Sequence, residues 1–584
     1  MSTFFSKIWG MRRNQQLILY STAVVIGIVV AYGTIAFREL INLTQIFTFG
    51  FGGEDIFTQA RQTPWWRVML APVMGGVMVA FMLRYIIKGG RPMGIADTIE
   101  ASSINNARMP LSQGLASATM SAISMGAGAS TGREGPIVHL GGTLASWFAD
   151  KLGLPPSLSR TLLGCGVATA VAASFNAPIA GVFFAMEVVL GHYAIHAFAP
   201  IVMASVVGTI ISRAHMGNYP AFILPDYDFA SMWDIPIIII LGVVCAFVSI
   251  GFLRSCLLAS DWFARINQVP RWLHPVIGGL MVGLVAIAFP HILGVGYEAT
   301  DTALHGGFIL PMLLVLIVLK IAMTSISLGA GFGGGVFSPS LFIGAMTGGA
   351  IGLVAAMIVP ATVASHGLFA IIGMGAVAGA VLGAPISTFL IVFELVGDYQ
   401  LSIAIMVATM IASIITRQMG ALSFFHAQLE NRGLKLRGGR ARHIVQTMRI
   451  ADVMTADYRT VDEAEGLDQV KIRVTLSPHS VLMVTGNDQA FQGMVTPESL
   501  SAATDTEKVE HFKATDVTTQ PTSLLYGDET LQKALSIMDV TREEYLPVLD
   551  NREDKQLIGI LLHRDALAAY KRVLLEEREE ERGE

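Results

Sequence analysis

The chain has 584 residues, of which 53% are hydrophobic and only 14% are charged. Soluble proteins carry roughly 25% charged residues, so this composition excludes a purely soluble protein. The formal net charge is −5, and such a balance gives no reason to expect a nucleic-acid partner.

Charged residues are unevenly distributed along the chain. Residues 1–426 are dominated by apolar runs, whereas residues 427–584 have the composition of an ordinary soluble sequence. We therefore predict an N-terminal segment at 1–16, a membrane domain over 17–429 and a soluble tail.

Several apolar runs approach the roughly 20 residues that a helix needs to cross a bilayer. They are Leu17–Phe37, Val68–Ile87, Ile235–Phe252, Val276–Ile292 and Ile309–Leu328. Other runs are shorter or broken by Gly and Pro, at 136–148, 159–175, 177–191, 337–358 and 366–382. Such segments indicate half-helices that meet near the middle of the bilayer, as they do in transporters.

Basic residues flank the predicted membrane domain at both ends. They are Lys7, Arg12 and Arg13 before it, and Arg432, Lys435, Arg437, Arg440 and Arg442 in a basic linker over 430–447. Positive charge is retained on the cytoplasmic side. We expect a multi-pass protein of the cell inner (plasma) membrane with its N- and C-termini in the cytoplasm.

A candidate anion-binding motif is Gly132-Arg133-Glu134-Gly135-Pro136. Proline suits the first turn of a helix, and the free N–H groups of a helix N-terminus bind anions without a formal cation. Glu134 is a carboxylate in an apolar domain, which makes it a functional candidate. Ionised, it would compete with an anion; protonated or displaced, it would admit one. The alternative is a first-turn Glu that only satisfies backbone N–H groups.

Similar motifs recur about 200 residues later. Gly126-Ala127-Gly128 and Pro136 match Gly329-Ala330-Gly331 and Pro339 with an offset of 203 (329 − 126 and 339 − 136), and residues 176–187 resemble 383–394 with an offset of 207 (394 − 187). The membrane domain is therefore predicted to be two related halves, at about 17–215 and 230–426. Such repeats in transporters often have inverted topology, with the binding site at their interface.

The tail contains two weakly similar units, at 448–505 and 513–574, and ends in a charged segment at 575–584. Each unit opens with a short Asp-Val segment. A helical stretch, a strand, a turn, a second strand and a closing helix then follow in both.

At these motifs the sequence resembles the CLC chloride channel and transporter family. Gly132–Pro136 and Gly335–Pro339 resemble the family's second and third anion-binding motifs, and the tail resembles a pair of CBS (cystathionine-β-synthase-type) domains. The resemblance implies an α-helical polytopic membrane protein with two inverted-topology repeats of broken and tilted helices, the CLC fold, followed by a small α/β cytoplasmic CBS pair. It also implies a homodimer in the lipid bilayer, with one pore per subunit and chloride as the bound permeant ion.

The resemblance assigns roles to single residues, with Glu134 as the gating glutamate. The implied anion-binding positions are Met93, Gly94, Ile95, Arg133, Gly135, Val336, Phe337 and Phe425, of which Val336 and Phe337 would use their backbone amides. Met93 replaces a serine of the family and Phe425 its pore tyrosine. Neither side chain donates a hydrogen bond to an anion, so fluoride, nitrate and bicarbonate stay open beside chloride. The methionine resembles the fluoride-transporting branch, whereas Gly135-Pro136 resembles the chloride branch.

Proton coupling depends on a second position. Glu187 aligns one residue before the family's internal proton-transfer glutamate, and Val188 occupies that site itself. Family channels commonly carry valine there, so we predict a voltage- or pH-gated chloride channel with Glu134 as gate. A proton-coupled chloride or fluoride antiporter is the alternative, because some antiporters lack that glutamate. We expect Glu187 and Glu394 to satisfy buried polar partners, and Lys320 to pair with a carboxylate.

CBS pairs often bind adenine nucleotides through a Thr or Ser and an Asp three residues later. The first unit has Thr496 but Ser499, and the second has Asp565 but Leu562. A structural dimerisation module is therefore favoured, with adenine nucleotide binding as the alternative. No catalytic nucleophile–base pair, metal set or required cofactor is visible, so we do not expect an enzyme.

Overall fold

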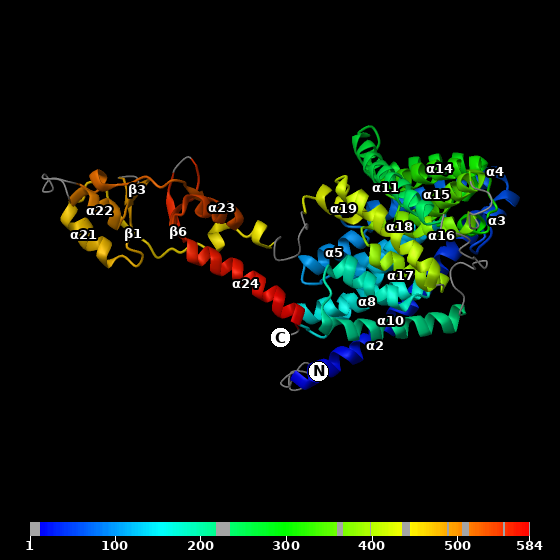
Figure 1. Cartoon of the computed structure of the whole chain (residues 1–584), viewed down its shortest axis with the longest axis horizontal. Helices are drawn as coiled ribbons and strands as arrows, with labels where there is room; N and C mark the ends of the chain where they lie inside the picture. Colours follow the sequence, from blue (N-terminus) through cyan, green and yellow to red (C-terminus); the bar gives the residue numbers. More distant parts are fainter. Residues whose placement is uncertain are drawn as a thin grey trace. The chain divides into compact units, whose positions relative to one another are not determined.

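The computed structural model describes residues 12–217, 234–358, 366–397, 399–434, 444–486, 490–504, 513–552 and 555–582. The chain divides into two compact units, Met1–Lys435 and Leu436–Glu584 (Figure 1). Several predicted basic residues lie outside the described ranges, namely Lys7, Lys435, Arg437, Arg440 and Arg442.

The first unit is helical throughout its described residues. Its first half contains α2 (Arg12–Phe49), α3 (Ile56–Gln62), α4 (Trp65–Tyr85), α5 (Ile95–Ser103), α6 (Leu111–Gly126), α7 (Glu134–Lys151), α8 (Pro156–Phe175), α9 (Pro178–Phe184), the π-helical turn η1 (Ala185–Leu190) and α10 (Ile195–Met216). Its second half contains α11 (Asp234–Arg265), η2 (Arg271–Leu273), α12 (His274–Ala288), η3 (Pro290–Ile292), α13 (Tyr297–Leu304), α14 (Leu310–Ala330), α15 (Phe337–Ile358), α16 (His366–Leu382), α17 (Pro385–Val396), α18 (Tyr399–Gln418) and α19 (Phe424–Asn431).

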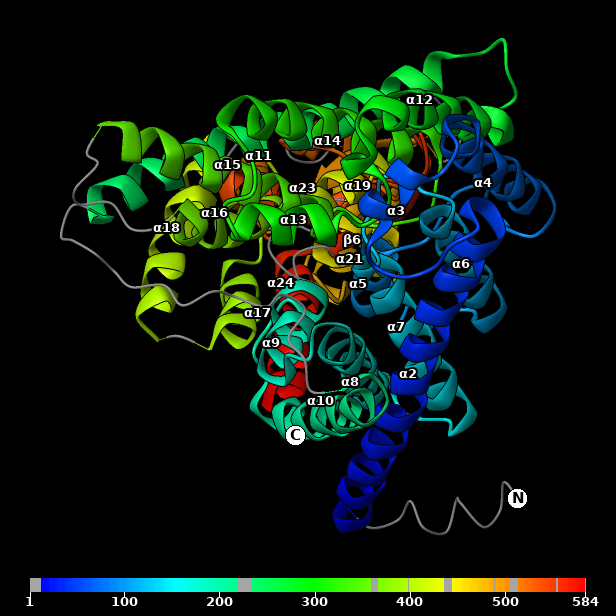
Figure 2. The ribbon, with the colours of Figure 1, turned by 90° about the vertical axis from the view of Figure 1, so that its right-hand side faces the viewer.

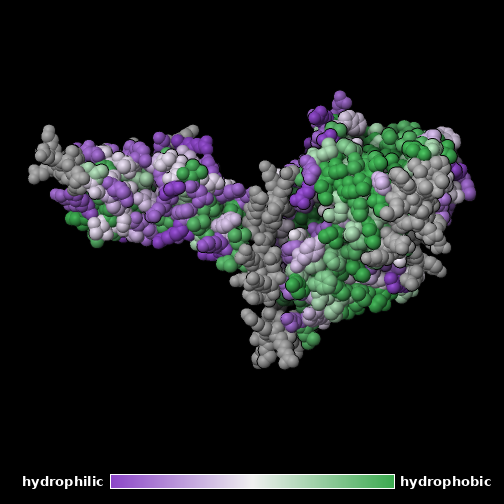
Figure 3. All heavy atoms as spheres, viewed as in Figure 1, coloured by the Kyte–Doolittle hydropathy of each residue, from purple (hydrophilic) through white to green (hydrophobic). Residues whose placement is uncertain are grey.

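Nine helical segments among the described residues are long and apolar enough to cross a membrane. Hydrophobic residues cover much of the visible face of this unit, whereas the second unit is largely hydrophilic (Figure 3). The multi-pass prediction is confirmed. The half-helix prediction is wrong for 159–175 and 337–358, because α8 has 20 residues and α15 has 22. The breaks lie at the ends of these helices rather than inside them.

Glycine contacts between helices repeat in the two halves. A Cβ atom added to Gly141 of α7 would lie 2.4 Å from the carbonyl oxygen of Gly166 in α8, and one added to Gly344 of α15 would lie 2.3 Å from that of Gly373 in α16. Small residues let helices in a membrane approach this closely. Both α7–α8 and α15–α16 pack tightly in this way, and α15 and α16 lie side by side (Figure 2).

The second unit is α/β and contains two sheets of the same topology. The elements are β1 (Arg459–Asp462), α21 (Leu467–Leu476), β2 (Leu482–Thr485), β3 (Phe491–Val495), α22 (Pro497–Thr504), η6 (Ala514–Val517), β4 (Leu525–Tyr526), α23 (Leu531–Thr541), β5 (Tyr545–Leu549), β6 (Leu557–Leu562) and α24 (His563–Arg582). In each sheet the first strand pairs parallel with the second, and the second pairs antiparallel with the third. This repeated order supports the two predicted CBS-like units.

The opening segment of each tail unit packs into the core of the other unit. Ile450 lies in the core formed around Leu531 and Leu546, whereas Ala514 and Val517 lie in the core around Val470. The two sequence units are therefore interlocked and form one body.

Candidate functional site

The two glycine-rich loops of the repeats meet directly. Gly132 N–H donates to the Gly335 carbonyl at 2.7 Å, and Gly335 N–H donates to the Gly132 carbonyl at 2.7 Å. These residues have the repeat offset of 203 (335 − 132). The start of α7 and the start of α15 thus lie together, at the interface where an inverted-repeat transporter would hold its substrate.

Side chains larger than that of glycine are crowded at this contact. A Cβ atom on Gly135 would lie 3.2 Å from the Gly335 Cα, and one on Gly334 would lie 2.3 Å from the Thr131 side chain. Gly334 also has a φ of 154°, a conformation that other residues rarely adopt. The glycine spacing in the sequence therefore serves the close approach of two helix N-termini.

Glu134 is held between the two repeats. Its side chain is buried at 3% exposure, Tyr297 Oη donates to its Oε1 at 2.8 Å, and Ser338 Oγ lies 2.5 Å from both carboxylate oxygens. Tyr297 begins α13 and Ser338 belongs to the first turn of α15. The carboxylate of one repeat thus occupies the helix N-terminus region of the other, where an anion is favoured.

Arg133 links Glu134 to a second carboxylate. Its Nε lies 3.9 Å from Glu134 Oε1, and its Nη1 donates to Glu54 Oε1 at 3.1 Å. Arg38 Nη2 donates to the same Glu54 oxygen at 2.7 Å. Burial would raise the pKa of Glu54, but the two guanidinium groups outweigh it and hold that pKa below its usual range. The predicted anion-binding Arg133 is thus already paired.

The backbone at Val336 and Phe337 offers donors for an anion. Both residues are buried, and α15 begins at Phe337. Neither backbone N–H donates a hydrogen bond to a residue that the structure describes. Two adjacent free N–H groups at a helix N-terminus can bind an anion without a formal cation.

The first predicted motif makes contacts of its own. Met93 is half-buried, and its N–H donates to Ser117 Oγ at 2.8 Å. The Gly94 N–H donates to Asp97 Oδ2 at 2.8 Å, so an Asp of the same helix occupies that amide. Ile95 is buried at the start of α5.

Phe425 is buried in α19, and α19 packs against both α5 and α16. Arg432, at the end of α19, contacts Asp97 at 3.0 Å and Glu100 at 3.6 Å in α5. These ion pairs therefore hold α19, which carries Phe425, against α5, which begins just after Met93.

Glu187 and Glu394 make reciprocal contacts. Glu187 accepts from the Ile386 and Ser387 N–H groups at 3.3 and 2.7 Å and from the Ser387 hydroxyl, at the start of α17. Glu394 accepts from the Ile179 and Ala180 N–H groups at 3.0 and 2.7 Å, at the start of α9. The partners keep the offset of 207 (386 − 179). Each carboxylate satisfies the N-terminus of a helix in the other repeat, as expected, and Val188 beside Glu187 is buried.

The prediction that Lys320 pairs with a carboxylate is wrong for the described residues. Its Nζ donates to the carbonyl oxygens of Ile292 and Gly294 at 3.1 and 3.0 Å and lies 5.0 Å from the Phe342 ring centroid. Backbone carbonyls and an aromatic face satisfy the buried ammonium in place of an ion pair.

Sequence reasoning missed three residues of the site: Tyr297, Ser338 and Glu54. Ser338 was visible in the second glycine-rich motif, but no role was assigned to its hydroxyl. Tyr297 follows a Gly-Val-Gly turn, and Glu54 lies in a polar break between apolar runs. Tyr297 is 163 residues from Glu134 along the chain (297 − 134), Ser338 is 204 residues away (338 − 134) and Glu54 is 80 residues away (134 − 54). Only the fold brings all three into the neighbourhood of Glu134.

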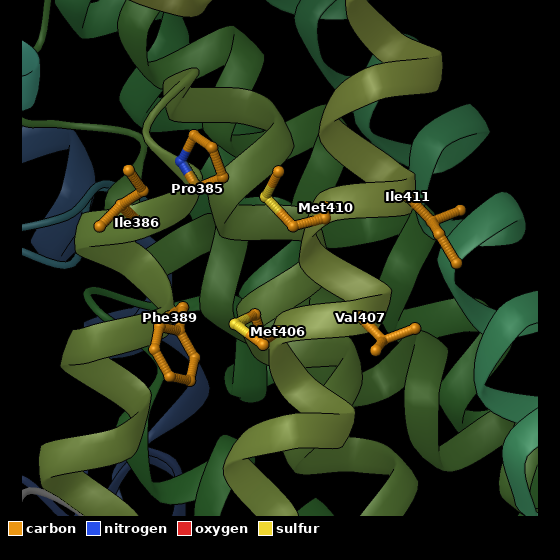
Figure 4. A pocket seen from close by; sticks show the side chains of 7 residues that line it. All are labelled: Pro385, Ile386, Phe389, Met406, Val407, Met410 and Ile411. Atoms are coloured by element: carbon orange, nitrogen blue, oxygen red, sulfur yellow. The ribbon is translucent and has the colours of Figure 1, made fainter.

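A separate hollow of about 490 Å³ lies between α17 and α18 (Figure 4). It is lined by Pro385, Ile386, Phe389, Met406, Val407, Met410 and Ile411. These side chains offer no hydrogen-bond donor, so this hollow has no chemistry for an anion.

The nucleotide candidates of the tail are engaged locally. Thr496 Oγ1 accepts from the Ser499 N–H at 3.2 Å, while the Thr496 N–H donates to Ser499 Oγ at 3.0 Å. Asp565 lies 3.4 Å from Arg564 on the same helix. The pair at the start of α22 thus caps its own helix.

Comparisons with known proteins match both units. Residues 75–417 match the family described as voltage gated chloride channel, and residues 514–572 match the CBS domain. The chain is 32% identical over 363 residues to the putative chloride channel protein ClcB-like of Ralstonia nicotianae, covering 62% of this chain and 84% of that one.

Two further matches bear on the fold and the family. The H(+)/Cl(−) exchange transporter ClcA of Vibrio cholerae is 31% identical over 259 residues, which cover 43% of this chain and 55% of the relative. The chain thus spans little more than half of that transporter. The structure of a slow cyanobacterial Cl−/H+ antiporter matches with a TM-score of 0.64 and 21% identity, covering 71% of this chain and 97% of that one. That structure supports the predicted fold.

Proposed function

The chain belongs to the voltage gated chloride channel family, the CLC family, and carries a C-terminal CBS domain; on that premise we propose that it exchanges chloride for protons through a pathway that Glu134 opens and closes. The observation that carries this proposal is the position of Glu134. Its carboxylate is buried where the glycine-rich loops of the two repeats meet, and it contacts Tyr297 and Ser338.

A carboxylate at the position of Glu134 couples the binding of a proton to the passage of an anion. The ionised carboxylate occupies a region that the N-termini of α7 and α15 make favourable for negative charge, so it excludes a permeating anion. Protonation removes that charge and weakens the contacts from Tyr297 and Ser338. Chloride then takes the vacated place and binds the free N–H groups of Val336 and Phe337. Because these donors are amides rather than buried cations, the anion can also leave.

The proposal differs from the sequence-based preference for a channel. The relative named an H(+)/Cl(−) exchange transporter supports exchange. A channel is the second candidate, and one feature favours it: Val188 carries no proton, and both oxygens of the neighbouring Glu187 accept hydrogen bonds from α17.

One experiment separates the two candidates. Purified protein in liposomes receives a chloride gradient without a pH gradient, and the internal pH is recorded. Exchange predicts that chloride movement drives protons uphill, and that Glu134→Gln abolishes proton movement while chloride still flows. Chloride flux without any proton movement in the wild type would support the channel and overturn the exchange proposal.

Selectivity is part of the proposal. We propose chloride as the principal substrate because the relatives are named for chloride. Parallel flux measurements with fluoride, nitrate and bicarbonate test this choice. Fluoride transport well above chloride transport would contradict it and would give weight to Met93.

We further propose that the protein acts as a homodimer in the plasma membrane, with both termini in the cytoplasm and without enzymatic activity. One chain supplies both glycine-rich loops and the gate, which supports one pathway per subunit. The molecular mass of the protein in detergent tests the dimer, and protease access to the tail in oriented vesicles tests the topology. A monomeric mass would contradict the dimer.

A further inference from the structure

A row of alternating charges leads from the gate toward the end of α2. Glu134 is followed by Arg133 at 3.9 Å, Arg133 by Glu54 at 3.1 Å, and Glu54 by Arg38 at 2.7 Å. The exposed fraction of the side chain is 3% for Glu134 and 9% for Arg133, but 48% for Glu54 and 40% for Arg38. Glu54, in the segment between α2 and α3, thus connects the buried gate to the exterior of the unit.

The guanidinium group of Arg133 lies between two carboxylates, those of Glu54 and Glu134. Its Nη1 donates to Glu54, whereas its Nε has no hydrogen-bond partner among the described residues and stops short of Glu134. Its guanidinium carbon also lies 4.7 Å from the Tyr297 ring centroid. A guanidinium has five N–H donors and can bind a carboxylate with two of them. Arg133 therefore donates a direct hydrogen bond to Glu54, whereas its contact with Glu134 is an ion pair without one.

Other charged groups near the gate face elsewhere. Glu298, next to Tyr297, accepts from the Phe57 and Thr58 N–H groups at the start of α3. Lys320 of α14 donates to loop carbonyls. From α13 and α15 the gate is faced by the hydroxyls of Tyr297 and Ser338. Among the described residues, the charged group in contact with Glu134 is thus Arg133, which contacts Glu54, which in turn contacts Arg38.

We propose that Glu54 is a positioning residue that sets the pH at which the pathway opens, by keeping Arg133, which is already an ion-pair partner of Glu134 at 3.9 Å, from donating a direct hydrogen bond to it. This inference rests on the proposed gating by Glu134. Arg133 and Arg38 hold the pKa of Glu54 below its usual value, so Glu54 is ionised at neutral pH. It therefore acts as a fixed restraint on Arg133, while Glu134 takes up the proton.

The substitution Glu54→Gln removes the charge that restrains Arg133. Arg133 is then free to donate a direct hydrogen bond to the ionised Glu134, so more acid is needed to protonate the gate. We expect the midpoint of acid activation of chloride flux to move to lower pH by up to about one unit, because this hydrogen bond is added to an ion pair that already exists at 3.9 Å. Arg38→Gln should move the midpoint the opposite way, because Glu54 then has Arg133 as its only guanidinium partner.

Asp55→Asn is the matched control. Asp55 is the neighbouring exposed acid of the same segment and forms no ion pair with a described residue. Its substitution removes the same charge without releasing Arg133, so it reports the general electrostatic effect. The measurement is chloride efflux from proteoliposomes at a series of symmetric pH values, which makes the orientation of the protein irrelevant.

The outcomes separate this inference from the proposed function. The expected pattern is an acid shift for Glu54→Gln, an alkaline shift for Arg38→Gln, the wild-type midpoint for Asp55→Asn and no pH dependence for Glu54→Gln/Glu134→Gln. Equal midpoints for Glu54→Gln and Asp55→Asn would overturn the role of Glu54 alone. If Glu134→Gln kept the wild-type pH dependence, the proposed function would fail first.

Discussion

At the scale of single residues, the proposed gate is the carboxylate of Glu134 with the hydrogen-bond donors that surround it. Glu134 was identifiable from the sequence because a carboxylate between two glycines and a proline is unusual in an apolar domain. Its partners were not identifiable. Tyr297 and Ser338 belong to the other repeat, and local sequence does not report which distant hydroxyl a carboxylate contacts.

Replacing Tyr297 by Phe tests one of these donors. Hydrogen bonds to charged groups contribute about 1.5–3 kcal/mol. Without this donor the ionised Glu134 is less stable in its buried position, so the pathway should open at a pH about one unit or more higher. Chloride efflux at a series of pH values measures this shift. Tyr85→Phe, at a side chain exposed on α4, is the control and should leave the midpoint unchanged; an unchanged midpoint in Tyr297→Phe would contradict the role of the hydroxyl.

At the scale of elements, carboxylates from one repeat cap the N-termini of helices in the other. The similar segments 176–187 and 383–394 predicted a repeat, and their last residues, Glu187 and Glu394, were expected to satisfy buried polar partners. The particular partners could not be predicted, because a reciprocal contact between the two repeats depends on how the repeats are placed in space. The lengths of α8 and α15 were also missed, since glycines inside them read as breaks although they serve helix packing.

Glu187→Ala removes the cap at the start of α17. We expect a loss of about 1–2 kcal/mol of stability, visible as a lower melting temperature of the purified protein. Glu394→Ala should give a similar loss, while Glu39→Ala, at an exposed position of α2, should give none.

Substitution of Glu187 also tests whether this residue transfers protons. Glu187→Gln keeps an acceptor at this position but cannot carry a proton. We expect an unchanged ratio of protons to chloride in the liposome assay, because the structure commits this side chain to α17. Loss of coupling in Glu187→Gln would assign it a role in proton transfer.

The ion pairs between α5 and α19 make a further prediction. Burial would raise the pKa of Asp97, but Arg91, Arg432 and the Gly94 N–H outweigh it and lower that pKa. The ionised form therefore stabilises the fold above the usual pKa of an aspartate, and this contribution disappears as the pH falls through the lowered value.

Asp97→Asn should lower the melting temperature at neutral pH, with a loss of roughly 1–3 kcal/mol from a partly buried charge and its hydrogen bonds. The difference from wild type should vanish under strongly acid conditions. Glu100→Gln, which loses a single contact at 3.6 Å, should have a smaller effect. A larger effect of Glu100→Gln than of Asp97→Asn would contradict this assignment.

At the scale of the whole molecule, two features of the sequence predicted the architecture. Matching motifs at offsets of 203 and 207 residues indicated two related halves, and the change of composition after 426 indicated a separate tail. The interlocking of the two tail units was not predictable. Ile450 and Ala514 look like ordinary hydrophobic residues of their own units, and only the fold shows that they complete each other's cores.

The tail is expected to bind no adenine nucleotide. Thr496 is engaged with Ser499, and Asp565 lies 3.4 Å from Arg564, so both nucleotide candidates already have partners within the chain. Addition of ATP or AMP to the full-length protein should leave its melting temperature unchanged, as should the same addition to Asp565→Ala. A concentration-dependent rise that Asp565→Ala abolishes would show that the tail is a nucleotide sensor.

The central claim is that the carboxylate of Glu134 opens and closes the anion pathway. The most direct measurement is chloride efflux from proteoliposomes across a range of pH values, for the wild type and for Glu134→Gln. The substitution keeps the size of the side chain but removes its titratable charge. We expect wild-type efflux to rise as the pH falls, whereas Glu134→Gln should conduct chloride at a rate that no longer depends on pH. Wild-type pH dependence retained in Glu134→Gln would contradict this claim.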